Sequence, residues 1–148
     1  MWTSFIGCEF VLPAPNIGRK RILVVDDNFE IRKLLVLYIE QSGYDTVEAA
    51  TGHQALEQAR ATTPNLIFMD LAMPDGTGDE AIVSLKADPL TRDIPVVVLT
   101  AFLGGALVNR AIAAGAAEIV HKPVDIKWLG LVIQRHLSVH QKTHHIVH

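Results

Sequence analysis

Five side chains that could bind a metal ion and a phosphoryl group each follow a short apolar run. They are Asp26, Asp27, Asp70, Thr100 and Lys122. A carboxylate beside a hydrophobic core is costly unless something compensates its charge. Carboxylates that lie close together repel and raise one another's pKa, and a divalent cation relieves this repulsion. Mg²⁺ suits such a set, because it binds carboxylate oxygens together with water and a phosphate.

A lysine and a hydroxyl near such a site add phosphate-binding groups. The ammonium of Lys122 can pair with a carboxylate or a phosphate oxygen, and Thr100 can donate a hydrogen bond to a phosphate. The carboxylate of Asp70 can itself attack a phosphoryl group and form an acyl phosphate. Each residue alone has an ordinary interpretation as a turn, a helix cap or a strand end. Their combination indicates one metal and phosphate site.

Alternating strand-like and helix-like segments would bring these residues together. Continuous apolar runs predict strands over residues 21–25, 44–49, 66–69, 94–99 and 118–120. Helical spacing and caps predict helices over residues 28–43, 51–61, 79–86, 106–114 and 126–137. Five such units favour an α/β fold, with a doubly wound parallel sheet and helices on both faces.

Ligands of such sheets bind beyond the carboxyl ends of the strands, near the point where the strand order reverses. The candidate residues follow four of the five predicted strands, so they should converge on one edge. The strand over 44–49 ends in Ala49 and Ala50 and is expected to contribute nothing. Asn28 should cap the first helix, whose inward stripe is predicted as Ile31, Leu34, Leu35, Tyr38 and Ile39.

The bulk properties exclude several classes of protein. The chain has 148 residues, a net charge of -3 and one cysteine, Cys8, so neither a nucleic-acid footprint nor a disulfide framework is expected. No apolar run approaches the roughly 20 residues that span a bilayer. We expect a soluble cytoplasmic protein with no direct nucleic-acid or membrane partner. One domain over 19–140 is predicted, between an N-terminal tail (1–18) and a C-terminal tail (141–148).

Four segments together resemble the receiver domain of response regulators in two-component signalling. They are ILVVDDN, MDLAMPDGTG, VVVLTA and HKP. The resemblance implies a flavodoxin-like fold with strand order 2-1-3-4-5. It also implies a phosphoprotein that takes part in signal transduction or a phosphorelay. Such a protein catalyses only its own phosphorylation and dephosphorylation and is not otherwise an enzyme.

The resemblance also implies residue roles. Asp70 would accept the phosphoryl group from a sensor histidine kinase or a phosphotransfer protein. Asp26 and Asp27, with Asp70 and the backbone carbonyl of Ala72, would hold Mg²⁺. Thr100 would move toward the phosphoryl oxygens, and Lys122, before a cis proline, would pair with the phosphate. Gly78, Glu80 and Pro123 are further matches to the family. The fourth helix, fifth strand and fifth helix would form the surface that changes on phosphorylation.

That last surface would contact a downstream protein or an output domain of the same chain, and it also allows a homodimer. The face of the first helix with Val36 and Leu37 would receive the kinase. One departure is Ile119, where the family usually has an aromatic residue whose rotamer follows the switch threonine. We therefore expect an altered readout, or one carried by the backbone between Leu99 and Gly105.

Alternatives to a stand-alone receiver remain open. The chain could be a piece of a hybrid kinase or multidomain regulator, or a pseudo-receiver that binds partners without phosphorylation; only Ile119 supports the latter. A phosphatase of the dehalogenase type needs a second aspartate where this chain has Ala72, which argues against it. No G-x-x-x-x-G-K-[ST] motif indicates a nucleotide site.

Overall fold

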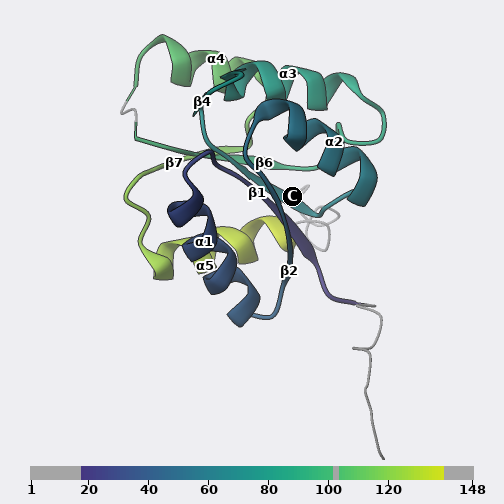
Figure 1. Ribbon diagram of the computed structural model, residues 1–148, viewed down its shortest axis with the longest axis vertical. Helices are drawn as coiled ribbons and strands as arrows, with labels where there is room; N and C mark the ends of the chain where they lie inside the picture. Colours follow the sequence, from purple (N-terminus) through teal and green to yellow (C-terminus); the bar gives the residue numbers. More distant parts are fainter. Residues whose placement is uncertain (1–17, 102–103, 139–148) are drawn as a thin grey trace, which may run out of the picture.

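A sheet of five parallel strands forms the centre of the computed structural model, which describes residues 18–101 and 104–138 (Figure 1). The strands are β1 (Arg21–Val25), β2 (Asp45–Ala49), β3 (Leu66–Met69), β6 (Val96–Thr100) and β7 (Glu118–His121). Their order is β2-β1-β3-β6-β7. A separate antiparallel hairpin consists of β4 (Ala72–Met73) and β5 (Gly76–Thr77). Without this hairpin, the order is the predicted 2-1-3-4-5, so the flavodoxin-like fold is confirmed.

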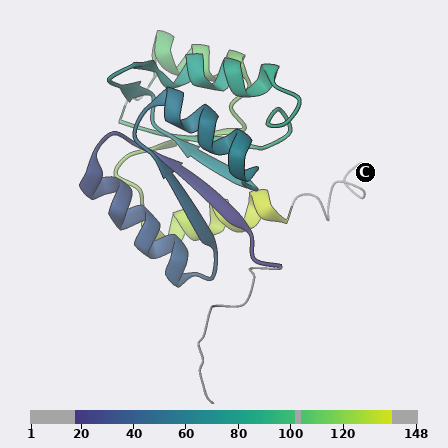
Figure 2. The same cartoon turned by 45° about the vertical axis from the view of Figure 1, so that its right-hand side comes forward.

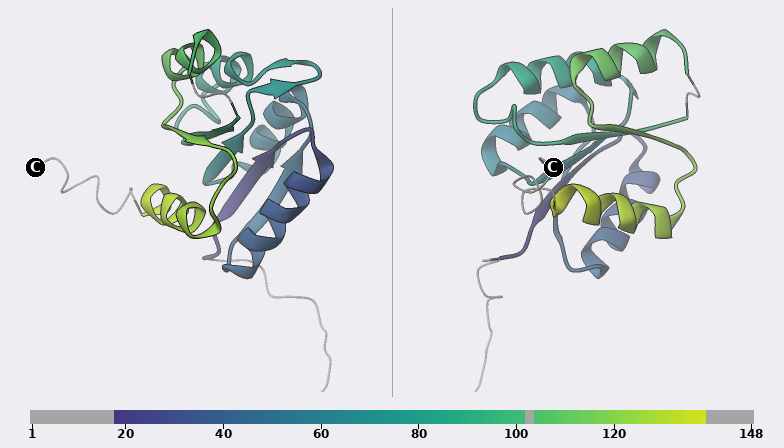
Figure 3. Two further views of the ribbon diagram at one scale, coloured as in Figure 1. Left: turned by 90° about the vertical axis from the view of Figure 1, so that its left-hand side faces the viewer. Right: turned by 180° about the vertical axis from the view of Figure 1, so that it is seen from behind.

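Helices cover both faces of the sheet (Figures 1 and 2). One face carries α1 (Phe29–Gln41) and α5 (Ile126–Leu137), and the other carries α2 (Gly52–Thr62), α3 (Gly78–Ala87) and α4 (Ala106–Ala114). Figure 3 shows the same two layers from the side and from behind. Alternate residues of the central strands enter opposite cores: Val24 packs with α1 and α5, while Leu23 packs with α2 to α4. Burial on both faces explains why the strand sequences are continuously apolar.

Side-chain caps begin the helices where the sequence predicts. The Asn28 side-chain oxygen accepts a hydrogen bond from the Ile31 N–H at 3.0 Å, and Thr51 Oγ1 accepts one from Gln54 N–H, also at 3.0 Å. Each bond satisfies a backbone donor that has no partner within its helix. The helices after β1 and β2 therefore start directly beyond the carboxyl edge of the sheet.

The predicted inward stripe of α1 is partly wrong. Leu35 and Ile39 are buried as expected, but Leu34 is 67% exposed and Ile31 is 37% exposed. Val36, which we expected on the outer docking face, is buried and packs against the sheet, whereas Leu37 is exposed. Apolar residues occupy more than one face of this helix, so spacing alone does not decide which face meets the strands.

Candidate functional site

Backbone pairing continues past the strand ends and brings the predicted residues to one edge. The Asp26 N–H donates to the Ala49 carbonyl at 3.1 Å, and the Asp70 N–H donates to the Val25 carbonyl at 3.0 Å. On the far side, the Lys122 N–H donates to the Thr100 carbonyl at 2.7 Å. Asp26, Asp70 and Lys122 are therefore held in the register of the sheet.

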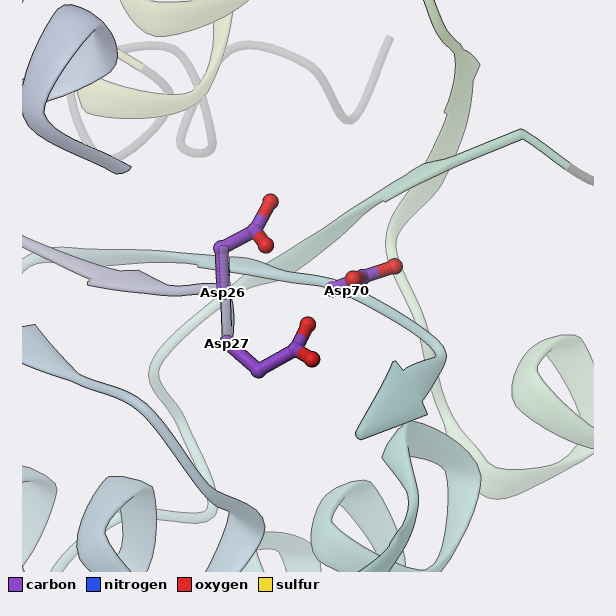
Figure 4. Close-up of side chains that lie close together, drawn as sticks. All are labelled: Asp26, Asp27 and Asp70. Atoms are coloured by element: carbon purple, nitrogen blue, oxygen red, sulfur yellow. The ribbon is translucent and has the colours of Figure 1, made fainter. Parts of the chain in front are cut away.

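The three aspartates form one cluster (Figure 4). One carboxylate oxygen from each of Asp26, Asp27 and Asp70 lies within 4.8 Å of the others, a geometry that could hold a metal ion. Asp26 and Asp70 are buried and Asp27 is exposed, so the cluster opens to solvent on one side. The predicted convergence of acidic oxygens from two separate segments is present in the structure.

Lys122 is the cation that faces this cluster. Its Nζ lies 2.9 Å from Asp26 Oδ2 and 3.6 Å from Asp70 Oδ2. The Lys122–Pro123 peptide bond is cis, as the resemblance implied. One ammonium therefore lies between two carboxylates and neutralises only part of their charge.

Backbone amides fix the orientation of both buried carboxylates. Asp26 Oδ1 accepts a hydrogen bond from Asn28 N–H at 2.9 Å, and Asp70 Oδ1 accepts one from Leu71 N–H at 2.8 Å. In both residues the other oxygen, Oδ2, is the one that faces Lys122. The pair is thus aligned before any ligand binds, and the side chains lose little rotational freedom on binding.

Burial raises the pKa of Asp70 above its ordinary value. Lys122 opposes this shift, and the negative charge of Asp26 adds to it. The net result is a carboxylate whose ionised form is disfavoured where it stands. A divalent cation beside Asp70 would favour the ionised form, because it reverses the sign of the local field.

The remaining predicted residues differ in burial and in the elements that carry them. Thr100 is fully buried at the end of β6, and Ala72 is exposed on β4. Gly105 precedes α4 with a φ of 90°, so this helix starts from a backbone conformation that favours glycine. Ile119 is half-buried on β7 and packs against the core beneath α2 to α4. Residues 102 and 103, in the predicted readout segment, lie outside the described residues.

Two contacts at this edge were not predicted from the sequence. Arg32 Nη1 donates to the Asp26 carbonyl at 2.7 Å, while its Nε donates to Glu48 Oε1 at 2.9 Å. Asp75 accepts hydrogen bonds from the first amides of α2. The sequence gives no local signal for either contact, since both partners come from other elements.

Comparison with known proteins agrees with this geometry. The family model for the response regulator receiver domain matches residues 22–134. The chain belongs to this family. It is a phosphorylatable receiver of two-component signalling, as its motifs indicated.

Relatives of this receiver include regulators of different lengths. It is 39% identical over 110 residues to the phosphate regulon transcriptional regulatory protein PhoB of Escherichia coli, covering 74% of this chain and 48% of PhoB. It is 36% identical over 107 residues to the polar-differentiation response regulator DivK of Brucella ovis, covering 72% and 87% of the two chains. The receiver thus spans about half the length of the PhoB proteins that it matches.

Solved receiver structures share the fold. A CheY-like receiver domain protein from Methanospirillum hungatei superimposes with a TM-score of 0.80 and 27% identity, covering 85% of this chain and 99% of that one. The receiver domain of a signal transduction histidine kinase from Syntrophus aciditrophicus superimposes with a TM-score of 0.75 and 32% sequence identity. The match covers 80% of this chain and 90% of that one. Among the described residues of this receiver, we find no helix with the length and apolar character that a membrane span requires.

Proposed function

We propose that Asp70 is the phosphoryl acceptor of this receiver and that Asp26 and Asp27 hold Mg²⁺ beside it. The cluster of three carboxylates supports this proposal, because it places two further acids within 4.8 Å of Asp70. Asp70 itself and the Ala72 carbonyl would complete the protein ligands. These are hard oxygen donors, which Mg²⁺ prefers.

In the proposed reaction, an oxygen of the Asp70 carboxylate attacks the phosphorus of a phosphohistidine. The P–N bond breaks, its electron pair returns to the imidazole, and an aspartyl phosphate forms. Bound Mg²⁺ would neutralise charge on the phosphoryl oxygens. Lys122, which already lies 3.6 Å from Asp70 Oδ2, would pair with one of these oxygens. On this proposal the receiver catalyses only its own phosphorylation and dephosphorylation.

Phosphorylation would then be read by the β6 and β7 side of the molecule. The phosphoryl group adds about -1.5 to -2 charge, which draws the hydroxyl of Thr100 and the ammonium of Lys122 toward it. Both residues lie at the carboxyl ends of neighbouring strands that lead into α4 and α5. We propose that the surface of α4, β7 and α5 carries the change to a downstream protein, an output domain or a second copy.

An apolar groove beside the site supports docking of a phosphodonor protein. This groove of about 470 Å³ lies between α1 and the segments after β6 and β7. Ile31, Leu34, Pro123 and Ile126 line it, and Lys122 lies at its edge. We propose this groove as the docking surface in place of the predicted face with Val36 and Leu37, because Val36 is buried. A sensor histidine kinase or phosphotransfer protein that packs here would bring its phosphohistidine to Asp70.

Phosphotransfer from a panel of sensor kinases tests the proposed roles, with acetyl phosphate as a small donor. Asp70→Asn should abolish labelling from every donor. Leu34→Asp should weaken transfer from the kinases and leave acetyl phosphate labelling unchanged. Leu131→Asp is the matched control, since Leu131 is 53% exposed on α5 and does not line the groove. A folded wild-type protein that takes no label from any donor would favour a pseudo-receiver.

A second candidate is that this receiver works as one module of a longer protein. The matches to PhoB over 48% of its length and to the receiver of a histidine kinase support it. The full gene sequence distinguishes a stand-alone receiver from a module of a longer protein.

The domain limits of 19–140 and the cytoplasmic location stay predictions.

A further inference from the structure

The tip of the β4–β5 hairpin is bound to the start of α2. Asp75, which lies between β4 and β5, accepts hydrogen bonds from the backbone N–H groups of Gly52 at 3.0 Å and His53 at 2.9 Å. Each amide is served by a different carboxylate oxygen. Asp75 therefore connects the loop that follows β3 to the helix that follows β2. These two strands lie on opposite sides of β1 in the sheet.

The N-cap residue of α2, Thr51, does not accept hydrogen bonds from the two amides that Asp75 binds. Thr51 serves the next two donors: its hydroxyl accepts from Gln54 N–H, and its carbonyl accepts from Ala55 N–H at 2.9 Å. The partial positive charge of a helix N-terminus favours a carboxylate. The two amide hydrogen bonds hold the pKa of Asp75 below its ordinary value, so the acceptor is ionised near neutral pH.

Close packing keeps α2 near the hairpin. A Cβ on Gly52 would lie 3.3 Å from Ala81 Cβ of α3 and 3.8 Å from both Asp75 oxygens. The absence of a side chain at this position therefore lets the first turn of α2 approach both α3 and the hairpin.

Contacts with the core and with α3 also hold the hairpin: Met73 packs against the core beneath α2 to α4, and the Thr77 N–H donates to Glu80 Oε1 at 3.3 Å. The strands of the hairpin pair at only two positions, Ala72 with Thr77 and Met73 with Gly76. At its base, the Gly78 N–H donates to the Leu71 carbonyl at 2.8 Å. A two-stranded hairpin is marginal by itself, so its position depends on contacts with the rest of the fold. Asp75 provides such a contact at the tip.

This hairpin carries parts of the candidate metal site. Leu71, directly before β4, donates its N–H to Asp70 Oδ1, and Ala72, the first residue of β4, is the proposed carbonyl ligand. A displaced hairpin would move both groups relative to Asp26 and Asp27. Tying the tip to α2 therefore fixes the geometry of the ligands at its base.

We propose that Asp75 is a positioning residue for Mg²⁺ binding, which acts by tying the β4–β5 hairpin to the first turn of α2. The inference rests on the proposed function, because it concerns the same metal site. Asp75 would touch neither the ion nor the phosphoryl group. Its loss should change the affinity of the site for Mg²⁺ while the ligands themselves remain.

The experiment compares four full-length proteins: wild type, Asp75→Ala, Asp75→Asn and Thr51→Ala. Mg²⁺ affinity is measured from amide chemical shifts at the cluster, and hydrogen exchange of Gly52 and His53 N–H reports the tether. Asp75→Ala should weaken Mg²⁺ binding by about tenfold, the lower end of the effect of removing an outer-shell partner. Asp75→Asn keeps one carbonyl acceptor and should recover part of the affinity.

Thr51→Ala is the matched control, because it removes a cap from the same helix and leaves the tether intact. It should lower the stability of α2 and keep wild-type Mg²⁺ affinity. Unchanged affinity in Asp75→Ala, or equal losses in Asp75→Ala and Thr51→Ala, would overturn the inference. If Asp75→Ala does not fold, Asp75→Asn decides by the same comparison. A wild-type protein that binds no Mg²⁺ refutes the proposed function, and the inference with it, before any variant is compared.

Discussion

Neutralising Asp70 should stabilise the metal-free receiver at neutral pH, although the substitution removes its proposed acceptor. Asp70→Asn keeps the shape of the side chain and the oxygen that accepts from Leu71 N–H. It removes one negative charge from a cluster that holds three carboxylates and one facing ammonium. The prediction therefore tests the electrostatics of the site without any phosphodonor.

The distances give the size of the effect. With an effective dielectric constant of about 20, Asp26, whose oxygen lies within 4.8 Å, repels Asp70 by at least about 3.5 kcal/mol, and Lys122 at 3.6 Å attracts it by about 4.6 kcal/mol. Exposed Asp27, also within 4.8 Å and with a dielectric constant of about 80, adds at least about 0.9 kcal/mol of repulsion. The repulsion is therefore about as large as the attraction or larger, which leaves the burial of Asp70 uncompensated. We expect Asp70→Asn to raise the free energy of unfolding by about 1 to 2 kcal/mol.

Urea unfolding followed by circular dichroism, with EDTA present, measures this difference. Because the folded-state pKa of Asp70 is raised, its ionisation destabilises the fold only as pH rises above the unfolded value of 3.8. The advantage of Asp70→Asn should therefore be full at pH 7 and shrink as pH falls toward that value. Asp125→Asn is the control, since asparagine caps a helix as well as aspartate does. Equal or lower stability of Asp70→Asn at pH 7 would refute the reasoning.

Three further predictions concern the same end of the molecule. Mg²⁺ at 100 times its Kd should stabilise wild type by about 2.7 kcal/mol in thermal melts, and at the same concentration Asp27→Asn should gain less. Gly78→Ala should destabilise by about 1 to 3 kcal/mol in urea, because a Cβ there overlaps the Asp70 carbonyl oxygen. Burial raises the pKa of Asp79, but hydrogen bonds from neighbours including Arg110 outweigh it and lower the pKa. Asp79→Asn should therefore cost about 1 kcal/mol at pH 7 in urea unfolding, and the difference should shrink as pH falls from 3.8 through the lower folded-state pKa of Asp79.

The sequence predicted the sheet and the cluster because both depend on patterns that neighbours in the chain reveal. Each central strand is buried on both faces, so Leu66 to Met69 read as one apolar run with Asp70 at its end. Parallel strands share a carboxyl edge, which makes the convergence of Asp26, Asp27 and Asp70 predictable once the order is known. The caps at Asn28 and Thr51 are equally local, since each bonds within three residues.

Features that depend on distant partners could not be predicted. Asp75 stands in a run that reads as a turn, and nothing near it indicates that α2 lies within reach. The stripe of α1 failed for a related reason: Leu34 and Val36 are both apolar, and only the packing of α1 beside α5 decides which is buried. Asp79 is the first residue of a predicted helix, and the residues near it give no sign of its partner on α4.

The contact between Asp26 and Lys122 joins positions 96 residues apart, so it spans most of the described chain. During synthesis the two acids leave the ribosome long before the lysine does. Until the last strand is added, their charges lack this internal counterion, and cations of the surrounding solution must screen them. The internal counterion of Asp26 is thus present only after the last strand has joined the sheet.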